Sequence, residues 1–257
     1  DSRIVLLPRR SGPPGHAANF EYLLEHAAKV GANHIFLADQ DDTWKPAKLQ
    51  AMTAAVGSSR GHTQGVFSDL ELVTADGKPQ GSYLSRAGLA GRHHLEALLS
   101  QNSVVGCSLM IRGELLHLAL PFPDGLENHD WWLAMCAASL GELLYIPEKL
   151  VNYRQHGGNT IGASNPLMRL SRLRSIVRRQ RRVWESKIVA VDELKDRLQR
   201  TGRPVPEVLS ASRRQVAPAG EWRASWRLLR SDFKPVSPSL LLVQLLALTP
   251  LTKATQD

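Results

Sequence analysis

Apolar and polar positions alternate through the first two thirds of the chain in a way that predicts short strands and helices. Apolar residues at helical spacing predict a helix over 19–30, capped by Asn19 and ended by Gly31, and an apolar run predicts a strand over 34–38. Further helices are expected over 46–56, 94–99, 114–118 and 128–140, and strands over 66–73, 108–111, 143–146 and 150–153. Such alternation favours an α/β fold in which helices flank a mixed, mostly parallel sheet.

The pattern changes near residue 165, where apolar residues begin to recur at helical spacing. This pattern predicts one long amphipathic helix or two shorter ones. Its apolar positions recur at spacings of three, four or seven residues: Leu170, Leu173, Val177, Trp184, Ile188, Val191, Leu194 and Leu198. The opposite face is rich in arginine, and Pro204 and Pro206 end the pattern. We therefore divide the chain into a first region, 1–163, and a basic helical C-terminal region, 164–257. The apolar stripe of this second region fits either packing in a helical bundle or attachment to a membrane surface.

The composition of the 257 residues is that of an ordinary globular protein, with 43% hydrophobic and 22% charged residues. It excludes a largely disordered chain, a collagen-like fibre and a disulfide-rich miniprotein. No apolar run reaches the roughly 18 residues that span a bilayer, and the longest, 240–248, is interrupted by Gln244. Cys107 and Cys136 could pair, but two isolated cysteines fit a reducing cytoplasm at least as well, and no signal-peptide pattern is visible.

The net charge of +8 is unevenly distributed. Residues 1–165 carry 13 Lys and Arg against 16 Asp and Glu, a net charge of −3, whereas residues 166–257 carry 19 against 8, a net charge of +11. A basic region favours an anionic partner, and we expect peripheral contact with an anionic membrane at its inner face. A solvated arginine-rich face is the structural alternative. No nucleic acid is expected as a partner, since no RNA- or DNA-binding signature is recognisable.

The segment 35–44 carries the clearest chemical signal, because an apolar strand is followed by three carboxylates, Asp39, Asp41 and Asp42. Crowded carboxylates repel one another unless a cation lies among them, and hard divalent cations prefer oxygen ligands. In open α/β sheets, ligands bind beyond the carboxyl ends of strands. The pattern indicates a site for Mn²⁺ or Mg²⁺ with a diphosphate, and an acidic helix cap ahead of Pro46 is the alternative.

Several other segments form an ordered set with this one. Residues 15–20 read Gly-His-Ala-Ala-Asn-Phe, and 37–48 read Leu-Ala-Asp-Gln-Asp-Asp-Thr-Trp-Lys-Pro-Ala-Lys. Residues 67–70 read Phe-Ser-Asp-Leu, and 102–110 include Gly106 and Cys107. Residues 129–132 read His-Asp-Trp-Trp, and 153–162 begin with Tyr-Arg-Gln-His and continue through Asn159 to Ile161-Gly162. In order and content, these segments of residues 1–163 resemble the motifs of family 2 glycosyltransferases of the GT-A fold, especially the rhamnosyltransferase-like branch.

The resemblance implies roles for the residues at matching positions. Asp39 and Asp41 match the Asp-x-Asp motif that holds the metal bridging the donor diphosphate, and His156 matches a late-loop residue that completes the metal shell. Asp130 matches the general base, which takes the proton from the acceptor hydroxyl. Donor binding would then involve Asp42, Arg154 and Asn159, and acceptor binding would involve Asp69, Gly106, His129, Trp131 and Trp132.

The implied function is that of an inverting, metal-dependent glycosyltransferase with a nucleotide-sugar donor. The branch label suggests dTDP-rhamnose as the donor, with a hydroxyl of a saccharide or lipid-linked saccharide as the acceptor in cell-surface polysaccharide synthesis. The strand, turn and helix with which the family binds the nucleotide have no counterpart here, so we expect this chain alone to be unstable or inactive.

Two other function classes stay open at this point. A metal-dependent phosphoester hydrolase explains the acidic segment 39–42 but not the order of the later motifs. A non-enzymatic basic membrane-binding module explains the charge of residues 166–257 but not the first region.

Overall fold

A computed structural model of the chain describes residues 1–12, 15–59, 62–91, 93–154 and 173–210. The helices are α1 (His16–Lys29), α2 (Lys48–Ser58), α3 (Tyr83–Ala87), α4 (Leu95–Ser100), α5 (Leu116–Ala119), α6 (His129–Leu140) and α7 (Leu173–Arg200), and η1 (Gly106–Ser108) and η2 (Gly113–Leu115) are short 3₁₀ turns. The strands are β1 (His34–Phe36), β2 (Thr43–Trp44), β3 (Thr63–Val73), β4 (Pro79–Ser82), β5 (Leu109–Arg112) and β6 (Glu142–Arg154).

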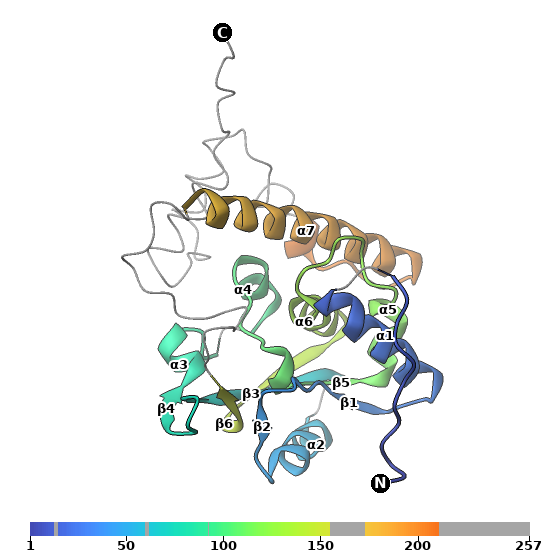
Figure 1. Cartoon of the computed structure of the whole chain (residues 1–257). Helices are drawn as coiled ribbons and strands as arrows, with labels where there is room; N and C mark the ends of the chain where they lie inside the picture. The colour runs from blue at the N-terminus through green and yellow to red at the C-terminus, as the bar shows by residue number, and fades with distance from the viewer. Residues whose placement is uncertain (13–14, 60–61, 92, 155–172, 211–257) are drawn as a thin grey trace.

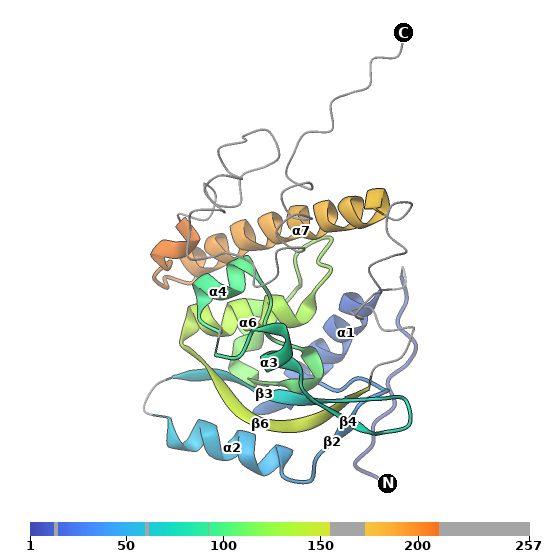
Figure 2. The ribbon, with the colours of Figure 1, turned by 90° about the vertical axis from the view of Figure 1, so that its left-hand side faces the viewer.

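One mixed sheet organises these elements into layers (Figures 1 and 2). The strand order is β1-β5-β3-β6-β2, and β4 pairs with β3. Helix α2 covers one face of the sheet, α1, α4, α5 and α6 lie on the other, and α7 crosses over these helices as an outer layer. Strand β3 is buried over its whole length because it has neighbours on both sides and helices on both faces.

The expectation of a mostly parallel sheet is wrong, although the mixed α/β class is confirmed. Among the described residues, β3 and β6 pair in parallel, whereas β1–β5, β2–β6, β3–β4 and β3–β5 are antiparallel. Parallel neighbours need a crossover of a dozen or more residues, usually a helix of some length. Between β3 and β5 the chain forms β4 and the short helices α3 and α4, and β5 runs antiparallel to β3.

Strand β6 was expected as two strands, over 143–146 and 150–153, but it is continuous in the structure. Its pairing with β3 shifts register between Ser68 and Leu70, where Ile146 and Lys149 face successive residues of β3. The extra residues on β6 include Pro147, which cannot donate a ladder hydrogen bond and suits a bulge.

Helix α1 begins one turn earlier than Asn19, the residue that we expected as its cap. Gly15 precedes the first helical residue, and Ala17, Phe20 and Leu24 form the buried stripe of the helix. Asn19 is exposed in the second turn. The short elements β2, β4 and α3 were not expected at all, since two to five residues give no measurable periodicity.

Helix α7 packs on the same hydrophobic core as the first region. Its buried apolar residues Ala190, Val191, Leu194 and Leu198 belong to one cluster with those of α1, α4, α5 and α6. The guanidinium of Arg197 donates to the carbonyl oxygens of Leu118, at 2.9 Å, and Pro121, at 2.6 Å. The expected apolar stripe is therefore covered by the protein itself from Trp184 onward, in a single helix; Leu170 lies outside the described residues.

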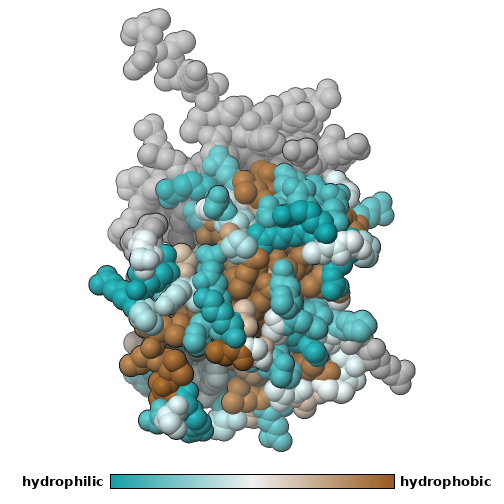
Figure 3. All heavy atoms as spheres, turned by 90° about the vertical axis from the view of Figure 1, so that its right-hand side faces the viewer, coloured by the Kyte–Doolittle hydropathy of each residue, from teal (hydrophilic) through white to brown (hydrophobic). Residues whose placement is uncertain are grey.

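Apolar residues are visible in brown between hydrophilic ones on the face that Figure 3 shows. The exposed large apolar residues include Ile4, Val5 and Leu6 in the N-terminal segment and Val30 at the end of α1. Within the described residues, no helix combines the length and apolar character that crossing a membrane requires.

The packing of α7 predicts a difference between two substitutions on this helix. Leu194→Ala removes a fully buried side chain and should lower the free energy of unfolding by about 2–5 kcal/mol, because it leaves a cavity. Val189→Ala, where the side chain is 51% exposed, should change it by less than about 0.5 kcal/mol. Urea unfolding of both variants measures this difference, and equal effects would show that α7 does not pack on the core.

Candidate functional site

The acidic segment is fixed between two strands at one end of the sheet. On one side, the backbone N–H of Leu37 donates to the carbonyl of Leu109, which begins β5. On the other side, β2 pairs with the end of β6, and Oδ1 of Asp42 accepts a hydrogen bond of 3.1 Å from the backbone N–H of Arg154. The carboxylates after β1 are therefore held at the end of β6 by backbone contacts.

Two of the three carboxylates converge with a thiol. Ligand atoms of Asp39, Asp42 and Cys107 all lie within 4.8 Å of one another. Burial, and then the charge of Asp42, raises the pKa of Asp39, and burial likewise raises the pKa of Asp42. Oδ2 of Asp42 is buried without a conventional hydrogen-bond donor, since its neighbour, the Cys107 thiol, donates only weakly. This oxygen suits a cation.

Asp41, which we expected beside Asp39 as a metal ligand, lies slightly apart from the converging ligand atoms. Its charge raises the pKa of both Asp39 and Asp42, so it lies near them, but it is not part of the converging group of ligand atoms. Asp42, which we expected as a supporting donor-binding residue, takes that place.

Lys48 supplies a positive charge beside the acid cluster. Its side chain is fully buried, and Nζ donates a hydrogen bond of 2.6 Å to the carbonyl oxygen of Cys107 while lying 3.7 Å from the centre of the Trp44 ring. Burial lowers the pKa of Lys48 to about 8, and Cys107, Asp42 and Asp39 oppose that shift. Lys48 thus ties α2 to the turn η1 and offsets part of the negative charge.

Asp130 lies at the start of α6, on the other side of η1. The backbone N–H of Trp131 donates to its carboxylate at 2.7 Å, and the N–H of Gly106 donates as well. Burial raises the pKa of Asp130 to about 6 despite these donors; His16 lowers it and the charge of Asp39 raises it. The base expected from the sequence is therefore electrostatically coupled to the acid cluster.

His129 is almost completely buried beside this carboxylate. Its ring stacks on Phe20 at a centroid distance of 3.9 Å and meets His16 edge-on at 4.6 Å. Both ring nitrogens lack a hydrogen-bond partner among the described residues. Burial lowers the pKa of His129 to about 3, so the ring is neutral at physiological pH.

Three other residues expected to bind the acceptor are buried and hydrogen-bonded within the protein. Trp131 and Trp132 are both buried, and their indole N–H groups donate to the carbonyls of Leu98, at 2.8 Å, and Ala119, at 2.9 Å. Asp69 is buried and accepts hydrogen bonds from the backbone N–H groups of Leu70 and Leu84 and from the Ser82 hydroxyl. The polar groups of all three therefore have partners within the protein.

The remaining expected residues divide into two groups. Gly106 lies against His129 and Asp130, whereas Arg154 is exposed and contacts Asp42 through its backbone. His156 and Asn159 lie outside the described residues.

Three residues to which we assigned no role from the sequence also face this region: His16, Lys48 and Lys187. Lys48 belongs to the motif block 37–48, so its spacing from the carboxylates was the available signal. His16 follows Gly15 at the start of α1, where a histidine gives no signal by itself. Lys187 lies three residues after Trp184 and four before Val191, on the apolar stripe of α7, so its helical spacing was the available signal.

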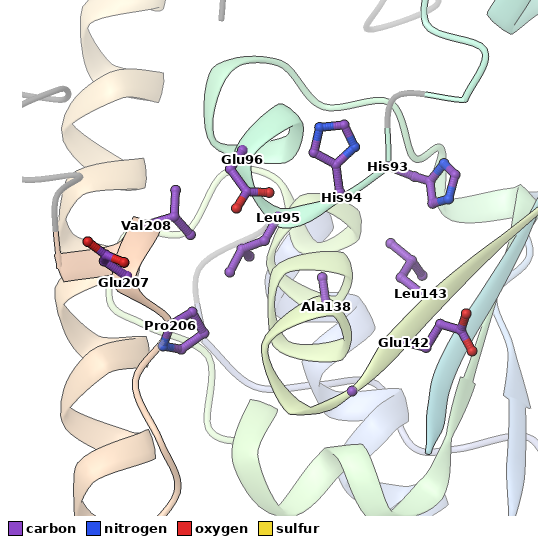
Figure 4. Close-up of a pocket in the computed structure, with 11 residues that line it drawn as sticks. His93, His94, Leu95, Glu96, Ala138, Glu142, Leu143, Pro206, Glu207 and Val208 are labelled. Carbon is purple, nitrogen blue, oxygen red and sulfur yellow. The ribbon is translucent and has the colours of Figure 1, made fainter. Parts of the chain in front are cut away.

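A cavity of about 470 Å³ lies elsewhere, between α4, α6, the start of β6 and residues 206–208 (Figure 4). Its wall includes His93, Glu96, Glu142 and Glu207. Because Glu142 begins β6 and Arg154 ends it, this cavity and the acid cluster lie at opposite ends of the same strand. The cavity is not part of the candidate site.

The site combines a candidate cation-binding cluster, Asp39, Asp42 and Cys107, with the nearby carboxylate of Asp130, whose pKa is raised to about 6. Such an arrangement is suitable for metal-assisted group transfer. No model of a known protein family matches the chain. The chain is similar to a curated protein of Nostoc sp. (strain PCC 7120 / SAG 25.82 / UTEX 2576) that is named an uncharacterized glycosyltransferase, with 30% identity over 141 residues. The matched stretch covers 52% of this chain and 42% of that protein, so the chain spans less than half of its relative.

The close approach at Gly106 predicts that this position does not tolerate a side chain. A Cβ at Gly106 would lie 3.0 Å from Nε2 of His129, so Gly106→Ala requires a shift of a few tenths of an ångström in a ring that is packed against Phe20 and His16. We expect a loss of about 1–3 kcal/mol in the free energy of unfolding. Gly57→Ala is the matched control, because a Cβ there meets nothing within 4 Å and alanine favours the helix. Equal stability of the two variants would contradict the packing described.

Proposed function

We propose that this chain carries the metal site and the general base of an inverting glycosyltransferase. The observation that carries the proposal is the position of η1 between two groups of carboxylates. Cys107 of this turn lies with Asp39 and Asp42, while Gly106, the residue before it, donates its N–H to Asp130. The similarity to a protein named a glycosyltransferase supports the same assignment.

The acid cluster has the chemistry that Mn²⁺ or Mg²⁺ requires. Asp39 and Asp42 offer oxygen ligands in a half-buried position, and Oδ2 of Asp42 has no conventional donor. Burial is the main cause of both raised pKa values and repulsion from neighbouring carboxylates adds to it, and a bound cation would offset both effects. We propose that these two residues hold the metal, with Asp41 beside them in the place that the Asp-x-Asp motif gives and His156 as a further ligand. The metal would neutralise charge on the leaving diphosphate.

Asp130 is the proposed general base. With a pKa of about 6 it is mostly ionised at neutral pH, yet it is basic enough to accept a proton near that pH. In an inverting transfer, it takes the proton of the acceptor hydroxyl while that oxygen bonds to the anomeric carbon and the bond to the diphosphate breaks. The two backbone N–H groups fix the carboxylate during this step.

The fold type, the donor and the acceptor are proposed from the sequence motifs. We propose the GT-A fold, a nucleotide-sugar donor such as dTDP-rhamnose, and a saccharide or lipid-linked saccharide acceptor, with Arg154 and Asn159 on the donor side. The net charge of +11 in residues 166–257 supports peripheral contact with an anionic membrane at the cytoplasmic face.

The metal proposal predicts selective loss of cation binding. Asp39→Asn and Asp42→Asn should each weaken Mn²⁺ binding by about tenfold or more, since each removes a charged oxygen ligand. Electron paramagnetic resonance of free Mn²⁺ measures the affinity without any activity assay. Asp76→Asn, in an exposed turn beside Lys78, is the control and should leave the affinity unchanged. Wild-type affinity in the Asp39 and Asp42 variants would reject this metal site.

The base proposal predicts a large kinetic effect without loss of metal binding. Asp130→Asn should lower turnover by about 10²–10⁴, the usual contribution of general base catalysis, while Mn²⁺ affinity stays the same. Release of nucleoside diphosphate with donor and acceptor present measures turnover. Glu127→Gln, an exposed acid in the loop before α6, serves as the control. A loss below threefold would argue against the role, and release that does not depend on an acceptor would favour a hydrolase.

A further inference from the structure

The turn η1 places a thiol beside two carboxylates of the acidic segment. The side chain of Cys107 is completely buried, and ligand atoms of Cys107, Asp39 and Asp42 all lie within 4.8 Å of one another. Asp39 and Asp42 come from the segment between β1 and β2, whereas Cys107 is the middle residue of η1, in a distant part of the chain. The fold, and not the sequence spacing, brings the sulfur to these oxygens.

Cys107 is held in this position from two sides. Nζ of Lys48 donates a hydrogen bond of 2.6 Å to its carbonyl oxygen, and the residue packs with Leu70 and Val151 in a small apolar cluster. Within the turn, the backbone N–H of Ser108 donates to the carbonyl of Val105 at 2.9 Å. The backbone of η1 therefore keeps the thiol beside the carboxylates.

One oxygen of this group still needs a partner. Oδ1 of Asp42 accepts a hydrogen bond of 3.1 Å from the backbone N–H of Arg154, whereas Oδ2 is buried and has no N–H or O–H donor among the described residues. Ligands bound to one Zn²⁺ at about 2.0–2.3 Å lie about 3–4 Å from one another. Small side-chain rotations therefore suffice to bring the sulfur and the two carboxylates onto one ion.

We propose that the sulfur of Cys107 is a metal ligand together with Asp39 and Asp42, and that it selects a divalent cation that accepts sulfur, such as Zn²⁺, over Mg²⁺. This inference rests on the cation site of the proposed function and narrows the choice of its occupant. A thiolate suits Zn²⁺, whereas a site of carboxylate oxygens alone suits Mg²⁺. As the sulfur–metal bond forms, the S–H bond breaks and the proton passes to the solvent.

The alternative is that Cys107 only fills space, as many buried cysteines do. Cys136, the other cysteine of the chain, has that role, because it is completely buried in the main hydrophobic cluster and is not in the group of candidate ligands. A packing role predicts that serine or alanine at position 107 leaves metal binding unchanged. Cys136→Ala is therefore the matched control for a buried cysteine.

Cobalt spectroscopy tests the sulfur ligand without any activity assay. Co²⁺ replaces Zn²⁺ in protein sites, and a thiolate bound to it adds a sulfur-to-metal charge-transfer band in the near ultraviolet. The wild-type chain should show this band on addition of Co²⁺, Cys136→Ala should retain it, and Cys107→Ser and Cys107→Ala should lose it. The wild-type spectrum needs no variant, so a variant that fails to fold leaves the test valid. A wild-type chain that binds no Co²⁺, or binds it without the band, overturns the proposal, and so does a band that persists in Cys107→Ser.

Metal affinities give the second measurement. Most sites bind Zn²⁺ more tightly than Mn²⁺ whatever their ligands, so the informative quantity is the change on substitution. Cys107→Ser should weaken Zn²⁺ binding by more than about tenfold, because even the loss of an outer-shell partner costs about 10–100-fold. Mg²⁺ binding should change by less than about threefold, since Mg²⁺ gains little from sulfur. Equal changes for the two cations would contradict the selective role of the thiol.

Sugar transfer separates this inference from the proposed function. If Co²⁺ shows the Cys107-dependent band but the chain transfers no sugar with any of these cations, the proposed function fails and the sulfur ligand stands. If Mg²⁺ supports transfer, and Cys107→Ser changes neither the transfer nor the affinity for Zn²⁺, the role of Cys107 is rejected and the proposed function stands.

Discussion

The hydrogen bond from Nζ of Lys48 to the carbonyl oxygen of Cys107 is the interaction on which the site depends. It fixes the turn η1, and η1 is the backbone segment that contacts both groups of carboxylates. A hydrogen bond from a charged donor contributes about 1.5–3 kcal/mol, and in this case the donor is completely buried. Through this bond, α2 holds in place the turn whose backbone donates to Asp130.

Burial of the charged groups explains why they must lie together. Asp39, Asp42 and Asp130 all have raised pKa values because their surroundings are poorly hydrated, and Lys48 and Lys187 have lowered ones for the same reason. Lys48 and Lys187 are the most completely buried lysines of this group, and removing a charge from water costs free energy unless a partner offsets it. The charges of Asp42 and Asp39 favour the charged form of Lys48.

The sequence predicts the elements better than their arrangement. Period and length located α1, β1, α2, β3, α6 and α7 to within a few residues, because each is long enough or apolar enough to show a pattern. The direction of β5 and the bulge in β6 depend on how the chain returns across the sheet, which no local pattern encodes. The choice of Asp42 over Asp41 as the partner of Asp39 depends likewise on the backbone contact at Arg154, which lies more than 100 residues away in the chain.

The two tryptophans after Asp130 make contacts that the motif alone does not predict. An aromatic pair beside a base suggests a surface for sugar rings, yet Trp131 and Trp132 point into the core on either side of α6. Each ring instead forms the contact surface for a cation of α7, Lys187 on Trp131 and Arg197 on Trp132 at 5.4 Å. The His-Asp-Trp-Trp motif therefore joins the start of α6 to the C-terminal helix. A region that its charge marks as a separate basic extension is, over its described residues, packed against the segment that carries Asp130.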